Sequence, residues 1–317
     1  NWTVVATPNN GTGDGVIAIS SNVTILNAKP FLIPSVVLNS TNISLNTTDV
    51  NLTVYVNASD PDNESIKIIY NWLRNNTPIA GLIMPFEGIN RTMYNKTWDY
   101  SGRGSHGSEQ GGAVWSATSG YDGKGAYTFD GVNDHVTAPI FKPGTGSFTW
   151  MGWLQSGEGG TSKLMFNHWT GDAGDAIVMG VNPTGFVCNN GGQATNKINF
   201  ILRDASTGYC VNSTTTVNDN KWYHVAGVRR NNSIEIYVNG VLENSLAGLS
   251  GLDISPDPAN LTIGGGPTFW FLTSTIDEVQ IFNRSLSGEQ IATIFRNQSY
   301  IVSNETLKNE NWSVQAT

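Results

Sequence analysis

The chain has 317 residues, a formal net charge of −8 and a pI near 4.9. Charged residues make up only 13% of it, against roughly 25% in an ordinary soluble domain. An acidic chain without lysine and arginine clusters does not favour a nucleic-acid partner. No run of 18 apolar residues occurs, so no membrane insertion is expected in this segment.

Signals for N-linked glycosylation are dense. A coat of glycans would replace charge as the solubilising layer, so we expect an extracellular, cell-surface protein with covalent N-glycans. The alternative is a β protein that is merely rich in Asn and Thr. The nineteen asparagines in N-x-Ser/Thr sequences with x other than proline are Asn1, Asn10, Asn22, Asn39, Asn42, Asn46, Asn51, Asn57, Asn63, Asn75, Asn90, Asn95, Asn212, Asn231, Asn260, Asn283, Asn297, Asn304 and Asn311.

These signals are absent between residues 96 and 211. A glycan is not tolerated where two protein surfaces meet closely, so this part of the chain is expected to carry a contact or ligand face. The alternative is that its asparagines lie inside the fold.

The first 80 residues have the pattern of short β-strands. Residues 1–28 contain two strands around a turn-rich stretch, and two strands alone cannot bury a core. In residues 29–80, Leu52, Val54 and Val56 alternate with polar neighbours, which predicts a strand with one buried face.

The last seven residues repeat the first seven. NWSVQAT at 311–317 matches NWTVVAT at 1–7 in five positions, 310 residues apart. This predicts one period of a repeating polymer, in which residues 1–28 close the module of a different repeat. The alternative is a chance match in a sequence rich in Asn and Thr.

Between residues 81 and 297 the pattern predicts many strands joined by glycine-rich turns. A helix is predicted at 288–297, where Ser287 caps an apolar stripe. The predicted strands are 82–86, 126–130, 147–154, 163–168, 176–181, 198–203, 261–264 and 274–282, together with a hairpin within 221–241.

The hairpin, KWYHVAGVRRNNSIEIYVNGV, resembles the central hairpin of laminin-G-like, concanavalin-A-type jelly-roll domains. The stretches WDYSGRGSHG at 98–107, AYTFDGVNDH at 126–135 and IDEVQIFNRSLS at 276–287 are similar to that family in the same order. Residues 60–62 (Asp-Pro-Asp) and 70–72 (Tyr-Asn-Trp) resemble immunoglobulin-like or cadherin-like modules.

The resemblances imply an all-β fold, with a concanavalin-A-like antiparallel jelly roll and a small, incomplete immunoglobulin-like β-sandwich. The expected organisation has closing strands of an immunoglobulin-like module at 1–28 and opening strands at 29–80. The jelly roll follows at 81–297, and the module resumes at 298–317.

Cys188 and Cys210 are the two cysteines, and no Cys/His spacing for zinc accompanies them. In an extracellular β domain they predict a disulfide between neighbouring strands, with two free thiols as the alternative.

A catalytic site is not expected. Related glycoside hydrolases place Glu-x-Asp-x-x-Glu or Glu-x-Asp-x-Glu on one strand, and neither spacing occurs here. His224 lies in a buried-strand pattern, which favours a core residue over a general base.

The jelly-roll resemblance implies a calcium site. The positions that match the family's ligands are Asp99, Asp130 and Asp277, and hard oxygen ligands suit calcium. The alternative is that these aspartates cap turns and hold strands.

Trp169, Phe269 and Trp270 are the aromatic residues expected at the surface, either stacked on a sugar ring or packed between subunits. Glycan density and the terminal repeat together favour a structural repeat of an extracellular filament, sheath or surface layer that associates with itself. The alternatives are a carbohydrate-binding adhesin module and an accessory domain of a secreted enzyme.

Overall fold

A computed structural model of the chain describes residues 3–22, 24, 26–42, 47–90, 96–140, 142–157, 163–169, 174–182, 188, 194–205, 207–255, 260–266 and 270–317. Residues 34, 35, 89, 90 and 96 are described by their backbone alone. Within these ranges the chain is nearly all-β, with one α-helix, α1 (Gly288–Phe295). None of the described helices is long and apolar enough to cross a bilayer.

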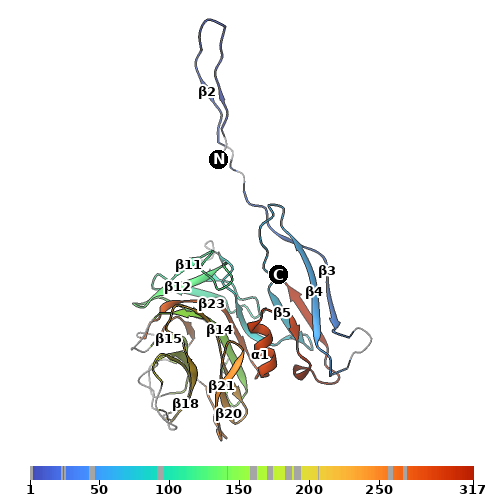
Figure 1. Cartoon of the computed structure of the whole chain (residues 1–317), viewed down its shortest axis with the longest axis vertical. Helices are drawn as coiled ribbons and strands as arrows, with labels where there is room; N and C mark the ends of the chain where they lie inside the picture. The colour runs from blue at the N-terminus through green and yellow to red at the C-terminus, as the bar shows by residue number, and fades with distance from the viewer. Residues whose placement is uncertain are drawn as a thin grey trace. The chain divides into compact units, whose positions relative to one another are not determined.

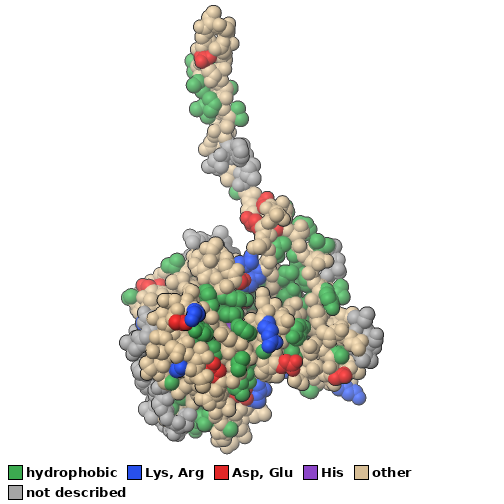
Figure 2. Space-filling view, viewed as in Figure 1, with side chains coloured by type: hydrophobic (Ala, Val, Ile, Leu, Met, Phe, Trp, Pro, Cys, Tyr) green, Lys and Arg blue, Asp and Glu red, His purple; other side chains and the backbone are tan. Residues whose placement is uncertain are grey.

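The chain forms two compact units, residues 1–35 with 56–68, and residues 36–55 with 69–317. The first unit contains a hairpin of β1 (Val5–Ala6) and β2 (Ala18–Ile19), in which Val5 pairs with Ile19. Its apolar side chains lie at the surface, as Figure 2 shows. A two-stranded hairpin cannot bury them by itself.

Two small sheets contain the segments on either side of the long central part of the sequence. The strands of one sheet are β3 (Phe31–Ser40), β4 (Leu52–Ser59) and β24 (Tyr300–Ile301), and those of the other are β5 (Tyr70–Arg74), β6 (Thr77–Pro78) and β25 (Trp312–Ala316). Ile301 pairs with Leu52, and Val314 pairs with Trp72. Residues near 300–316 therefore lie beside strands that precede them by more than 230 positions.

The central part folds into two large antiparallel sheets (Figure 1). The nine-stranded sheet has, in spatial order, β18 (Thr207–Thr216), β17 (Lys197–Asp204), β16 (Ala176–Val181), β15 (Lys163–His168), β22 (Leu261–Ile263), β13 (His135–Ala138), β10 (Gly107–Gln110), β9 (Lys96–Thr97) and β8 (Ile89–Asn90).

The eight-stranded sheet has the order β11 (Val114–Ser116), β12 (Ala126–Asp130), β23 (Thr273–Phe282), β14 (Phe148–Ser156), β19 (Trp222–Arg230), β20 (Ser233–Val238) and β21 (Val241–Ala247), and β7 (Ala80–Met84) also pairs with β23. The predicted all-β jelly roll is confirmed.

One continuous apolar core lies between the two large sheets. Trp150 meets Phe166 edge-on at 6.1 Å between ring centroids, and Phe148 meets Phe200 at 6.2 Å. A Cβ at Gly227 would lie 2.7 Å from the Phe200 ring, so only glycine admits this contact. The alternating apolar side chains of the hairpin strands β19 and β20 point into this core.

The predicted helix is confirmed, with the cap that its sequence indicates. The Ser287 side chain accepts a hydrogen bond from the Gln290 amide at 3.2 Å. Beyond α1, a short 3-10 turn, η2 (Ser303–Glu305), leads to β25.

Candidate functional site

The candidate site lies where the pairing of the long strand β23 is interrupted. One edge of β23 pairs with β12 over Thr273–Ile276 and with β7 over Val279–Phe282. Asp277 and Glu278 lie between these two pairings. On the other edge, the register with β14 shifts between Met151 and Trp153. The bulge opens the sheet at a position where side chains from three segments meet.

Three carboxylates converge at this opening. Glu87 follows β7, Asp122 belongs to the loop before β12, and Glu278 is in β23. Each offers an oxygen within 4.8 Å of the others, and among the described residues this is the group that has the spacing of a metal site. We name Glu87, Asp122 and Glu278 the acidic trio.

Asp277 holds the loop that carries Asp122. Its side chain is fully buried, its Oδ2 accepts a hydrogen bond from the Tyr121 amide at 3.1 Å, and its Oδ1 accepts one from the Glu278 amide at 2.7 Å. The Tyr121 ring stacks on Trp153 with centroids 4.0 Å apart. Asp277 thus fixes the two backbones that carry Asp122 and Glu278.

The backbone is strained on both sides of the trio. Glu278 has φ +52°, and Phe86, which precedes Glu87, has φ +58°. Non-glycine residues pay an energetic cost in this region, and such strain concentrates at functional sites. The Phe86 carbonyl accepts a hydrogen bond from the Trp115 indole at 2.7 Å, which holds the unusual conformation in place.

One carboxylate of the trio also acts on a neighbouring tyrosine. Burial, followed by the negative charge of Glu87, raises the pKa of Tyr100 above its ordinary value. Several carboxylate oxygens close together are ligands of the hard type that calcium prefers. The acidic trio therefore fits a hard divalent cation.

The structure corrects the calcium ligands that the resemblance implied. Asp99 accepts hydrogen bonds from the Ile83, Ser101 and Ser105 amides and from the Ser101 hydroxyl, so it holds a turn. Asp130 accepts one from the Val132 amide.

The three aspartates do not come together. Asp130 pairs with Thr273, which lies four residues, or about 13 Å of strand, from Asp277. Among the described residues, no group with metal-ligand spacing contains any of the three. The alternative reading, that they cap turns and hold strands, describes their contacts.

The expected surface position of Trp169 is also wrong. Trp169 is only 7% exposed, stacks on Trp270 with centroids 5.6 Å apart, and packs with Leu164 and Ile201 in a small second core. The Arg203 guanidinium lies 5.7 Å from the Trp169 ring centroid. The indole is buried because its own chain covers it. Phe269 lies outside the described residues.

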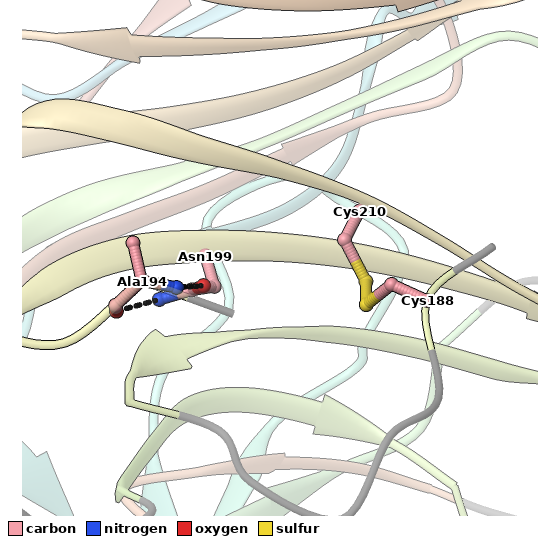
Figure 3. The surroundings of a disulfide bond; sticks show 4 residues. All are labelled: Cys188, Ala194, Asn199 and Cys210. Carbon is pink, nitrogen blue, oxygen red and sulfur yellow. Dashed lines mark hydrogen bonds between the residues drawn. A yellow bond between two sulfur atoms is a disulfide. The ribbon is translucent and has the colours of Figure 1, made fainter. Parts of the chain in front are cut away.

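A disulfide joins Cys188 to Cys210, with Cα atoms 5.7 Å apart, so the predicted pairing is confirmed. Figure 3 shows it beside the mutual hydrogen bonds of Ala194 and Asn199, at 3.0 and 3.2 Å. Cys210 is in β18 and Cys188 bridges Gly208. The bond therefore fastens Cys188 to β18 beside Trp169.

The asparagines fall into two groups by exposure. None of the glycosylation-signal asparagines with a described side chain is buried. In the signal-free part, Asn167, Asn182 and Asn199 are buried. Burial thus accounts for part of the gap in the signals. Asn1, Asn46 and Asn95 lie outside the described residues, and Asn90 is described by its backbone alone.

Sequence reasoning missed the acidic trio because its members are far apart in the chain. Glu87 and Glu278 are separated by 191 positions, and Asp122 lies between them in the sequence without a motif that links the three. The available signal was the position of Glu278 next to Asp277 in a motif shared with jelly-roll domains.

No curated protein matches the sequence. The receptor binding domain of botulinum neurotoxin C/D mosaic serotype is 14% identical with a TM-score of 0.52, over 69% of this chain and 51% of that one.

The botulinum neurotoxin serotype G binding domain is 15% identical with a TM-score of 0.51, over 69% and 51%. The receptor binding domain of botulinum neurotoxin D is 13% identical with a TM-score of 0.52, over 69% and 52%. The chain thus spans about half the length of these structures, and at this identity the likeness is one of fold.

Residues 130–292 match a laminin G family model described as Concanavalin A-like lectin/glucanases superfamily. The matched segment includes β14, β19, β20 and β23, the strands that form the centre of one sheet. The chain belongs to the concanavalin A-like lectin/glucanase superfamily.

Proposed function

We propose that this chain is a repeating structural unit of an extracellular, N-glycosylated surface assembly, and that its jelly roll is an insert displayed by that assembly. The observation that carries the proposal is the place of the repeated heptapeptide. Its second copy, at 311–317, contains β25, which pairs with β5. An ion pair between Arg74 and Glu310, 236 residues apart in the chain, lies at one end of this pairing.

The first copy of the heptapeptide has no comparable partner among the described pairings. β1 pairs with β2 alone, and Val4 and Val5 are exposed. The heptapeptide is therefore a strand of a three-stranded sheet near the C-terminus and part of an exposed two-stranded hairpin near the N-terminus. A polymer of repeats gives both copies the same environment.

Two further observations support an extracellular assembly. Exposed glycosylation-signal asparagines lie on both small sheets, at Asn57 and Asn75, and on the jelly roll, at Asn231 and Asn283. The disulfide Cys188–Cys210 is of the kind that persists in oxidising compartments.

Electron microscopy of native surface material tests this function. Filaments or layers with a repeating globular unit, labelled by an antibody against the jelly roll, are the expected result. Antibody label found only on dispersed, non-repeating particles would contradict the structural role.

A second candidate function, carbohydrate binding with the help of calcium, is favoured by the acidic trio. The solved structures with this fold include domains named as receptor binding, and the superfamily description includes lectins. The trio offers the oxygen ligands through which a bound cation could hold a sugar. We propose no catalytic activity for the jelly roll.

A glycan array in calcium tests this candidate. A reproducible hit that disappears with Glu278→Gln, and persists with Trp270→Ala, would place a sugar at the trio. A hit that Trp270→Ala removes and Glu278→Gln leaves unchanged would assign binding to the Trp169 and Trp270 pair instead. The absence of any hit would contradict the lectin role.

A further inference from the structure

Strand β25 uses only one of its two edges in the described sheet order β25-β5-β6. Thr317 exchanges both backbone hydrogen bonds with Ile69, at 3.0 and 2.9 Å, and the Asn311 carbonyl accepts one from the Asn75 amide at 2.7 Å. In an antiparallel ladder the backbone groups of successive residues point to alternate sides. The odd-numbered residues of this segment therefore face β5, and Val314 and Ala316 face the other edge.

The equivalent residues at the other end of the chain already have a partner on that other edge. The Val4 carbonyl accepts a hydrogen bond from the Ser20 amide at 2.9 Å, and the Pro8 carbonyl accepts one from the Gly15 amide at 2.6 Å. Val4 corresponds to Val314 in the repeated heptapeptide. By the same alternation, the even-numbered residues of the first copy face β2.

The two copies are thus complementary in their hydrogen bonding. One copy uses its odd-numbered residues towards β5, and the other uses its even-numbered residues towards β2. A strand with both partners would use every backbone group once. Had both copies used the same side, β5 and β2 would compete for one edge, and a common arrangement would be excluded.

The sequence differences between the copies agree with this alternation. The even-numbered residues are identical in the two copies: Trp at positions 2 and 312, Val at positions 4 and 314, and Ala at positions 6 and 316. In β25 these even-numbered side chains are half-buried, whereas the side chains of Ser313 and Gln315 are exposed. The substitutions, Thr3 for Ser313 and Val5 for Gln315, fall at the exposed positions.

We propose that a β2 strand from the following repeat of the same polypeptide pairs with the free edge of β25. The heptapeptide 311–317 of one repeat then serves as residues 1–7 of the next. The completed sheet has the order β2-β25-β5-β6, with Ala18 of the following repeat opposite Ala316 and Ile19 opposite Gln315, the register that β1 and β2 already show. This inference rests on the proposed repeating assembly.

Burial gives the arrangement a driving force. Val16, two residues before Ala18 and on the same side of the strand, is 90% exposed in the hairpin. Across the completed sheet this side is shared with Val314, which pairs with the buried Trp72. The strand would also cover an edge that is otherwise open to unwanted pairing.

Amide hydrogen exchange on an extended chain tests the proposal. Residues 8–27 are appended after Thr317, so that the second copy of the heptapeptide continues as the first copy does. The Val314 and Ala316 amides are expected to exchange at least about tenfold more slowly than in the 317-residue chain, since each gains a partner. The Ser313 and Gln315 amides, which already face β5, are expected to change little.

Two matched extensions serve as controls. In the first, the appended residue equivalent to Ala18 becomes proline, which removes an amide that faces β25. In the second, the appended residues are scrambled. Both are expected to leave Val314 and Ala316 as fast as in the 317-residue chain.

Three results would overturn the proposal. The first is unchanged exchange at Val314 in the extended chain, and the second is equal protection by the scrambled extension. The third is concentration-dependent protection in the 317-residue chain, which would show donation between separate chains. Because the measurement is made within one polypeptide, it stands apart from microscopy of native material, so either proposal can fail without the other.

Discussion

Arg284 and the buried Glu305 form an ion pair, with Nη2 and Oε2 2.7 Å apart. Burial lowers the pKa of Arg284 from its ordinary value, and the negative charge of Glu305 acts in the opposite direction. The second Glu305 oxygen, Oε1, accepts a hydrogen bond from the Ser287 amide at the start of α1. The pair therefore joins the helix cap to the segment that leads to β25.

Replacing Glu305 should destabilise the protein. Glu305→Ala removes the carboxylate that neutralises the mostly buried Arg284 guanidinium and leaves it the Glu305 backbone carbonyl, so the free energy of unfolding is expected to fall by about 2 kcal/mol in urea titrations. Glu305→Gln keeps an acceptor for Ser287 and should cost less than alanine. Equal stability of the alanine variant and the parent chain would show that the pair contributes nothing.

Calcium should stabilise the jelly roll through the acidic trio. At about 100 times its Kd, a bound ion adds about 2.7 kcal/mol, or roughly 5 °C in Tm for a chain of this size. Glu278→Gln should remove the increase because it removes a charged ligand. Asp130→Asn serves as the control, since Asp130 lies outside the trio, and should retain the increase. A Tm that is the same in calcium and in chelator would exclude the site.

Acidification should destabilise the protein through His224. The ring is buried against Trp153 and Phe295, and burial lowers its pKa from 6.5 to about 4. As the pH falls below 6.5, His224 becomes protonated in the unfolded chain but stays neutral in the folded chain. Stability contributed by the neutral ring is therefore full above about 6.5 and is lost progressively down to about 4.

The expected loss from this residue is about 3 kcal/mol over that window. His224→Phe keeps the aromatic packing and cannot titrate, so urea unfolding of the variant between pH 4 and 7 should show a flatter profile. A variant with the same pH dependence as the parent would assign the acid sensitivity to other groups.

Removing the disulfide should loosen one face of the nine-stranded sheet. The bond closes a loop of 22 residues, for which chain-entropy arguments give about 3 kcal/mol. The double variant Cys188→Ala, Cys210→Ala should unfold at a lower urea concentration than the parent chain. If reduction of the parent leaves the urea midpoint unchanged, the bond has no stabilising role.

Local pattern was enough for much of the fold. The strands at 126–130, 163–168 and 176–181, and the helix that begins after Ser287, occur where periodicity and capping predicted them. These elements have a strong apolar alternation or a clear cap. β18 and β21 were missed, because residues such as Asn212, Thr214 and Asn244 are polar and have no apolar period to detect.

The sequence by itself determined the strands with a clear apolar period, the helix cap and the repeated heptapeptide, because each depends on residues close together or on a direct match of letters. Only the tertiary structure decided which carboxylates meet. Glu87, Asp122 and Glu278 converge because β7 and β12 pair with successive parts of β23, and a bulge turns Glu278 towards the opening. Asp99, one of the three ligands that the resemblance implied, accepts hydrogen bonds from the Ile83, Ser101 and Ser105 amides instead. The geometry of the ligands depends on strand register and backbone conformation in strands that are distant in the chain. The local spacing of residues in the sequence predicts neither the register nor the conformation.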